Sequence, residues 1–374
     1  MCTLGTEQQA AKELAARVAR EHLAPRAAEI DRSEDGVAET LSKIGEAGFL
    51  GISIPAMYGG SALDTFSLVL VLEELARGSA SMALCCLAHA AACRAIAKGG
   101  TEDLKDGLLP HLVQGTSLAA LTVHEAGSGA VSTLIETEAI RQGDYYVVNG
   151  SKVFATNGAY ADYFVTLVRT DPAKGPAGIS FLVIERGTEG FTVGAHHRRM
   201  GLNGTGSREL FFDGCRVPTG HLLGMEGAGL ELLLSVVREV GMPGMAAIAL
   251  GLSEAALEAA ILHARQRTLG REVLGAKGAI RDMVAEMSTL VSAVKASLYC
   301  AATNAGTISP FQAKLLATET ALRVTDLALQ VHGGHGYSSE FPVERYYRDA
   351  RGLKLHFMTS EILRETIARQ VLEI

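Results

Sequence analysis

The sequence lacks several features that would mark particular classes of protein. No cluster of basic residues is interleaved with aromatic residues, and the 374 residues carry a formal net charge of −7. This pattern argues against nucleic acid and anionic membrane surfaces as partners. No Cys-x-x-Cys pair occurs, so the cysteines favour reduced thiols in the interior of a cytoplasmic protein. They are Cys2, Cys85, Cys86, Cys93, Cys215 and Cys300.

Targeting and membrane signals are also missing at the sequence level. Residues 1–25 mix acidic and basic side chains at helical spacing and lack the apolar core of a secretory signal. No other run looks long and uncharged enough to cross a bilayer. Hydrophobic residues nevertheless make up 48% of the chain, with 20% charged. We therefore expect a globular cytoplasmic protein with a large packed interior.

The periodicity of apolar residues divides the chain into three regions: 1–117, 118–222 and 223–374. The first region has the three- and four-residue spacing of helices. The second has the two-residue spacing of short strands separated by turns, which predicts a small β-barrel or sandwich. The third is rich in Ala and Leu at helical spacing, as in a helical bundle. Expected helices in the first region are Glu7–Glu21, Ala38–Ala47, Phe66–Arg77, Ser81–Lys98 and Thr101–Gln114. Expected strands are Leu118–Val123, Leu134–Arg141, Tyr145–Phe154, Tyr163–Arg169, Ile179–Glu185, Thr192–Ala195 and Glu209–Val217. The predicted fold class is α+β, with helices to the end of the chain after Leu222, an interruption at Gly241–Gly244, and one last helix over Arg348–Arg364.

Six short segments, in order, resemble the signatures of the acyl-CoA dehydrogenase family. Each alone is weak, but together they span nearly the whole chain. They are Ile54–Gly60, Leu121–Gly129, Asn149–Gly158, Met200–Gly201 leading to Phe211–Pro218, Gln330–Tyr337, and Arg348–Arg364. The resemblance implies an N-terminal helical domain, a central β domain and a C-terminal four-helix bundle.

The resemblance also implies that the chain binds FAD. Phe154 takes the place of a Trp that stacks on the flavin, and a phenyl ring still offers an apolar face. Thr156 matches a residue whose hydroxyl lies by flavin N5. The turn at Gln330 matches one through which a neighbouring subunit receives the ADP half, which implies a homotetramer or homodimer. The full set of implied cofactor residues is Leu121, Thr122, Gly127, Ser128, Phe154, Thr156, Gln330, Gly333, Gly334, Thr359 and Glu361.

The sequence departs from the family at the residue that removes the substrate α-proton. The family has Glu where this chain has Phe357, and a phenyl ring cannot accept a proton. Some branches carry the base on another helix, and that position is Gly241 here. Glu239 resembles a group that binds the pantetheine of a thioester, and Ser128 is a second candidate substrate contact. Val123–Glu125 also departs from the family pattern and puts the shape of that loop in doubt.

His356 is the candidate catalytic residue. In flavin monooxygenases with the same fold, a His at this offset from an Arg-Asp pair points to the flavin C4a–N5 edge. An imidazole can also abstract an acidic α-proton at neutral pH. The alternative is a helix residue without a catalytic role. Among the other histidines, we expect His196 and His197 to lie in a solvated loop. His89 lies on an apolar helix face and is expected in the core. His124 could face the ligand. No cluster has metal-ligand spacing.

Three functional hypotheses remain at this point. The first is FAD-dependent oxidation of an acyl thioester, carried on CoA or an acyl carrier protein, with His356 as the base in a biosynthetic step. The second is a flavin monooxygenase that uses His356 near flavin C4a. The third is a catalytically silent flavin-binding protein. The first two require an electron acceptor or a flavin reductase, which the sequence does not identify.

Overall fold

The helices of the N-terminal region begin close to the residues that the apolar spacing predicts. The structure is a computed structural model that describes residues 4–303 and 308–373. Asp64 accepts a hydrogen bond from Ser67 N at 2.8 Å and so caps α4. The N-terminal helices are α1 (Thr6–Val18), α2 (Ala27–Ser33), α3 (Val37–Glu46), α4 (Thr65–Gly78), α5 (Ala80–Gly99) and α6 (Glu102–Gln114). The C-terminal helices are α7 (Gly229–Val236), α8 (Met242–Gln266), α9 (Gly278–Ala302), α10 (Pro310–His332), α11 (Val343–Leu353) and α12 (Ser360–Leu372).

The strands between the two helical regions form one sheet in the order β6-β7-β3-β2-β4-β5-β8, with β1 added beside β4. Their bounds are β1 (Ala119–Thr122), β2 (Glu138–Gln142), β3 (Tyr145–Ala155), β4 (Tyr163–Arg169), β5 (Ile179–Glu185), β6 (Phe191–Val193), β7 (Arg208–Pro218) and β8 (Leu222–Leu223). In the part of the chain that the structure describes, β1 pairs only with β4, in parallel. One edge of β1 is therefore not used for strand pairing.

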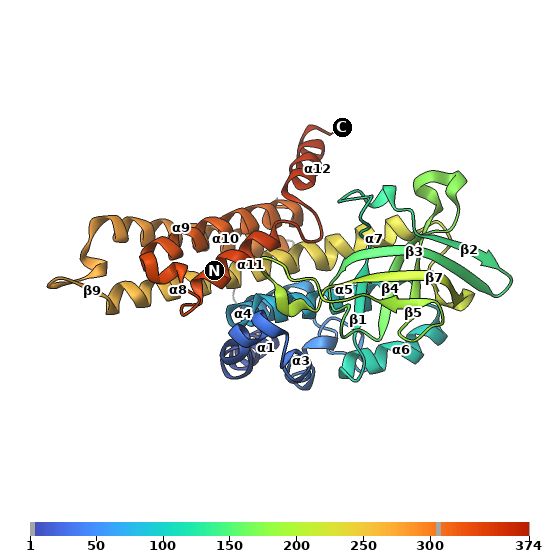
Figure 1. Cartoon of the computed structure of the whole chain (residues 1–374), viewed down its shortest axis with the longest axis horizontal. Helices are drawn as coiled ribbons and strands as arrows, with labels where there is room; N and C mark the ends of the chain where they lie inside the picture. Colours follow the sequence, from blue (N-terminus) through green and yellow to red (C-terminus); the bar gives the residue numbers. More distant parts are fainter. Residues whose placement is uncertain (1–3, 304–307, 374) are drawn as a thin grey trace.

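The three regions are arranged as the predicted fold class requires. The β domain lies at one end of the molecule, and the long helices α8, α9 and α10 extend away from it (Figure 1). The N-terminal helices lie along the opposite side of α8 from α9 and α10 (Figure 1). One apolar core joins the two helical regions, and a smaller one, which includes Tyr146, Phe164 and Phe212, fills the β domain. The α+β expectation is confirmed.

Three expectations for the C-terminal region were wrong. A two-stranded hairpin, β9 (Thr268–Leu269) with β10 (Glu272–Val273), lies between α8 and α9. Gly241–Gly244 does not interrupt its helix, because a π-helical turn at Val237–Gly241 leads from α7 into α8 and accommodates Pro243, which has no N–H to donate. The last helix is broken, since α11 ends at Leu353 and α12 begins only at Ser360.

Two helices also correct the expectation that no segment is long and apolar enough to cross a membrane. Ala80–Gly99 and Gly229–Gln266 pass that test by length and composition. Both are mainly buried inside the protein, with 89% and 67% of the tested windows covered. Helices in the core of a globular protein have the same composition, so these two segments are weak evidence for a membrane span.

The thiols in the described residues pack as predicted. Cys85, Cys86, Cys93 and Cys215 are buried, Cys300 is partly buried, and all five are unpaired. Cys2 lies outside the described residues. Cys93 Sγ lies 3.3 Å from His89 Nε2, but Ala119 N donates to His89 Nδ1 at 3.1 Å. Nε2 therefore carries the proton and cannot activate the thiol, which agrees with a core role for His89.

A buried ion pair sets the shape of the loop that follows β1. Lys152, which has no exposed surface, donates to Glu125 at 2.6 Å. The same carboxylate accepts from Glu136 N at 2.6 Å and Thr137 N at 3.0 Å. Lys152 also donates to Val123 O at 3.3 Å. Although Val123–Glu125 departs from the family pattern, the loop has a defined shape, because Lys152 and two backbone N–H groups bind it.

We predict that Lys152→Met lowers the free energy of unfolding by about 3–5 kcal/mol, because it leaves the buried Glu125 carboxylate without its cation. Urea denaturation followed by circular dichroism measures this. The double variant Lys152→Met/Glu125→Gln should recover part of the loss, since it removes the unpaired buried charge. The single amide oxygen can replace only one of the two carboxylate oxygens that accept from Glu136 N and Thr137 N. Arg369→Met, which removes an exposed pair with Glu365, is the control and should change the unfolding free energy by less than about 0.5 kcal/mol. Equal losses in the single and double variants would contradict the assignment.

Candidate active site

An exposed aromatic ring stands at the end of β3. Phe154 has 68% of its surface exposed and a backbone φ of 56°, which is unusual for a bulky residue. The pairing of β3 with β7 shifts register between Lys152 and Ala155, and Val153 N donates to His124 O at 2.9 Å. A strained, exposed phenyl ring on a rigid strand is a suitable face for a planar ligand.

The residues predicted on β1 offer mainly backbone to a ligand. Thr122 is buried, and its hydroxyl lies 3.0 Å from Thr166 Oγ1 and 3.4 Å from Val165 O. That hydroxyl is used inside the sheet, so the predicted hydroxyl contact of Thr122 is not supported by this geometry. Leu121 is partly buried beside it on the same strand. Cofactor contacts from β1 would have to come from the open edge of the strand.

The loop after β1 combines a fixed shape with an accessible backbone. Ser128 is buried, and its Oγ accepts from Glu125 N at 3.3 Å. Gly127 and Gly129 are exposed, and a β-carbon at either would have no atom within 4 Å. Thr156, two residues after Phe154, is buried. The loop and the end of β3 therefore present backbone and one aromatic face to the same region, joined through Val153 and His124.

His356 lies in the turn between α11 and α12 rather than in a helix. Its Nδ1 is 2.9 Å from Gly352 O, and a carbonyl oxygen can only accept, so Nδ1 carries the proton and Nε2 is left as an acceptor. Burial lowers the pKa of His356 to about 4, against the effect of the hydrogen bond to Gly352 O. The positive charges of Arg199, Lys314 and His124 lower it further. His356 is therefore a neutral imidazole at physiological pH.

The two positions at which the sequence resemblance led us to expect the base lie against each other. A β-carbon placed on Gly241 would be 2.5 Å from Cδ1 of Phe357 and 2.8 Å from its Cε1. The phenyl ring thus covers the glycine of the π-helical turn. Phe357 has a backbone φ of 59°, which orients this ring. Neither position supplies a carboxylate, and the ring leaves no room for one at Gly241.

Glu239 lies in the same π-helical turn and is already paired. Its carboxylate accepts from Lys98 Nζ and from Ser235 Oγ, the latter at 3.0 Å. Although burial acts in the opposite direction, these hydrogen bonds lower the pKa of Glu239. Glu239 is therefore ionised and fixed. It suits the predicted contact with a thioester chain better than a role as a free base.

The remaining predicted cofactor residues fall into two groups. Thr359 caps α12 by accepting from Ile362 N at 3.5 Å, and Glu361 is exposed in the first turn of that helix, so both are near His356 in the chain. Gln330, Gly333 and Gly334 are exposed at the end of α10. There His332 stacks on His263 of α8 at 4.2 Å, near the hairpin that lies farthest from the β domain (Figure 1). One protomer does not bring this second group to Phe154.

The other predicted histidines bind separate partners. His196 Nδ1 is 3.3 Å from Glu34, and His197 Nε2 is 3.6 Å from Glu209. Both imidazoles are exposed, as expected for a solvated loop. Two residues that the sequence did not single out lie near His356: Arg199, and Lys314, which is fully buried in α10. The sequence did not indicate a special role for Lys314, because a lysine within a predicted helix is usually a solvent-exposed residue.

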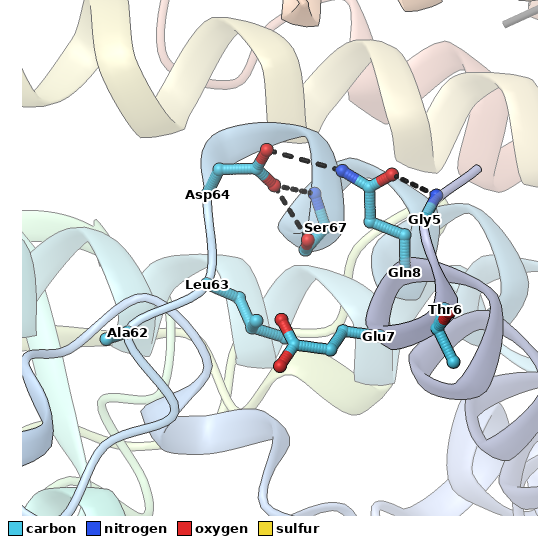
Figure 2. A pocket seen from close by; sticks show the side chains of 8 residues that line it. All are labelled: Gly5, Thr6, Glu7, Gln8, Ala62, Leu63, Asp64 and Ser67. Atoms are coloured by element: carbon cyan, nitrogen blue, oxygen red, sulfur yellow. Dashed lines mark hydrogen bonds between the residues drawn. The ribbon is translucent and has the colours of Figure 1, made fainter. Parts of the chain in front are cut away.

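A shallow hollow lies elsewhere, between the N-terminal segment and the start of α4 (Figure 2). Figure 2 shows Asp64 joined to Ser67 and to Gln8, whose Nε2 is 3.3 Å from Oδ2 of Asp64. Its polar groups thus serve the helix cap and the N-terminal segment. We assign no function to this hollow.

Comparison with known proteins matches three successive parts of the chain to models of the acyl-CoA dehydrogenases: the N-terminal domain over residues 5–116, the middle domain over 119–215 and the C-terminal domain over 227–372. Acryloyl-CoA reductase (NADH) from Anaerotignum propionicum is 36% identical over 99% of this chain and 96% of its own. The structure of butyryl-CoA dehydrogenase from Megasphaera elsdenii is 33% identical, with a TM-score of 0.94 over all of both chains. The prolyl acyl carrier protein oxidase AnaB is 28% identical, with a TM-score of 0.90 over 99% of this chain and 100% of the other. Another similar structure, 26% identical with a TM-score of 0.93 over 99% of both chains, is an FAD complex of PigA.

The exposed face of Phe154 and the open backbone at Gly127 and Gly129 fit a bound FAD. We predict that Phe154→Ala weakens FAD binding by on the order of 1–3 kcal/mol, because it removes the apolar face. Titration of the apoprotein with FAD, followed by flavin fluorescence, measures this. Phe211→Ala is the control, since Phe211 is a 43% exposed phenylalanine on β7, and should bind FAD as the wild type does. Equal affinity in both variants would contradict the stacking role.

Proposed function

Because the chain belongs to the acyl-CoA dehydrogenase family and is an FAD-dependent oxidoreductase of that type, we propose that it oxidises an acyl thioester with His356 as the proton acceptor. Bound FAD supplies the acceptor for the β-hydride. The chain's own task is then to hold the thioester and to take the α-proton. Phe154, Thr156 and the backbone of the loop after β1 would hold the flavin, and Thr359 and Glu361 would contact it beside the turn.

The observation that carries this proposal is the tautomer of His356. Its Nδ1 proton is committed to Gly352 O at 2.9 Å, so Nε2 holds the free lone pair. Burial keeps the ring neutral, with a pKa of about 4. A neutral imidazole with a free lone pair is ready to accept a proton.

The same pKa limits the substrate. General-base catalysis is most efficient when the pKa of the base is near the operating pH, and a pKa of about 4 makes His356 a weak base. The substrate should therefore have an acidified α-proton, or lose a group such as CO₂ or sulfinate in place of that proton. This requirement favours a specialised biosynthetic step.

The thioester carrier is either CoA or an acyl carrier protein. Glu239 and Ser128 are the proposed contacts to the thioester arm. Similarity to a protein named as a prolyl acyl carrier protein oxidase supports a carrier protein, and similarity to one named as an acryloyl-CoA reductase supports CoA. The separation of Gln330, Gly333 and Gly334 from Phe154 supports a homodimer or homotetramer in which FAD is shared between subunits. We place this enzyme in the cytoplasm, with its electron acceptor or flavin reductase to be identified.

One observation also favours the second candidate, a flavin monooxygenase. Neither family position for the base bears a carboxylate, and the group that remains, His356, is neutral. Such an imidazole beside flavin C4a is compatible with oxygen chemistry. A catalytically silent flavin-binding protein would instead be indifferent to the state of His356.

The test of the proposed function is anaerobic mixing of the FAD-loaded protein with a panel of acyl thioesters on CoA and on acyl carrier protein. We expect one of them to bleach the flavin absorbance and to yield the α,β-unsaturated thioester. If none bleaches it, and an oxygenated product forms only with O₂ and an external reductant, the monooxygenase assignment replaces ours. If neither reaction occurs, the silent assignment replaces both.

We predict that His356→Gln lowers the rate of flavin bleaching by roughly 10²–10⁴-fold, the usual contribution of a general base. Glutamine can still donate to Gly352 O but has no basic nitrogen. Stopped-flow absorbance measures the rate. His197→Gln is the control, since His197 is an exposed histidine, and should react at the wild-type rate. An unchanged rate in His356→Gln would rule out the base.

We further predict that Phe357→Glu restores oxidation of simple acyl-CoA substrates. The new carboxylate would replace the ring that now covers Gly241, at the position from which the family removes the α-proton. Steady-state assays with saturated acyl-CoA measure the gain. Phe357→Gln has nearly the same size without the charge and should show none. Failure of Phe357→Glu with FAD still bound would mean that the thioester does not bind in the family's orientation.

A further inference from the structure

The turn that carries His356 is strained. Met358 N donates to His356 O at 2.7 Å, which closes a γ-turn around Phe357, and Phe357 has a φ of 59°. A γ-turn with positive φ at its central residue is rare and unfavourable. Such a turn persists only when the surrounding structure holds it.

Lys314 binds the main chain at the residue that follows the strained Phe357. It lies on α10, has no exposed surface, and its Nζ donates to Met358 O at 2.6 Å. Within residues 4–303 and 308–373, no carboxylate lies within 4 Å of this ammonium group. Burial lowers its pKa to about 8. The charges of Glu319 and Glu361 act in the opposite direction on this pKa. Neither carboxylate touches the ammonium group, and burial of a cation without such a contact is costly.

The turn has two further contacts, on either side of the strained residue. His356 Nδ1 is bonded to Gly352 O at the end of α11, and the ring of Phe357 covers Gly241. Neither of them fixes the chain after Phe357. Among the hydrogen bonds of the described residues, the one from Lys314 to Met358 O holds the main chain directly after Phe357. Thr359 begins the next helix one residue later, so this bond joins the turn to α10 beside His356.

We propose that Lys314 is a positioning residue, which holds the γ-turn at Phe357 so that the imidazole of His356 faces the thioester beside the flavin. This inference rests on the proposed function of His356. Lys314 does not itself contact the substrate. If it were merely part of the core, an apolar side chain of the same length would serve equally well.

The test is Lys314→Met in the FAD-loaded protein, with Lys354→Met as the control. Lys354 lies two residues before His356 and pairs with Glu319 at 2.8 Å, so its variant removes one positive charge near the same turn. We expect Lys314→Met to keep its FAD and its thermal stability, while kcat falls roughly 10- to 100-fold with little change in KM. The visible circular dichroism of the bound flavin should change in Lys314→Met and remain as in the wild type in Lys354→Met.

A second variant covers the case in which Lys314→Met does not fold. Lys314→Ala leaves space for a small amine, and we expect propylamine to restore both the flavin circular dichroism and kcat. Wild-type kcat and circular dichroism in Lys314→Met would overturn the proposal, and so would loss of FAD in both variants without recovery by the amine. If no thioester bleaches the wild-type flavin, the proposed function fails. The circular dichroism and a crystal structure of Lys314→Met, with φ measured at Phe357, still decide the role of Lys314.

Discussion

The hydrogen bond between His356 Nδ1 and Gly352 O determines what chemistry this site can perform. It commits one imidazole nitrogen to the backbone and leaves the other as an acceptor, while burial keeps the ring neutral. The family's usual arrangement uses a carboxylate as the base. In this chain a phenyl ring and a glycine stand at the two positions where the resemblance led us to expect the carboxylate, and the neutral His356 is next to Phe357 in the chain. We propose that this change restricts the enzyme to substrates with an acidified α-proton, while the fold of the family is retained.

Backbone strain occurs at two of the residues that we propose face the ligand. Phe154 at the end of β3 and Phe357 in the turn after α11 both have positive φ, and the π-helical turn that contains Gly241 is a further local irregularity. Strain of this kind is commonly found at functional sites, where the surrounding structure compensates for it. The pair between Lys152 and Glu125 anchors the loop beside β3, and the bonds from Lys314 and His356 hold the turn at Phe357. The site is thus preorganised by elements from all three regions of the chain.

The sequence predicted the fold class and the order of the helical and β regions, because apolar periodicity reports directly on burial. It also pointed to His356 and Phe357, which are neighbours in the chain. It could not predict that Gly241 lies against Phe357, since that contact joins segments more than a hundred residues apart. Nor could it predict that the Thr122 hydroxyl is used within the sheet, or that Lys314 is buried. A broken last helix was missed because the residues from Lys354 to Thr359 contain neither Gly nor Pro, the usual signals of a helix end.

The most direct test of the central claim is to measure α-proton exchange without oxidation. A thioester with sulfur in place of the β-carbon can lose its α-proton but has no β-hydride to give. Incubated with the protein in D₂O, it should take up deuterium at the α-carbon, as measured by mass spectrometry. Our account predicts that this exchange is rapid in the wild type and is lost in His356→Gln. Equal exchange in the two proteins would show that another group accepts the proton, and would contradict the account.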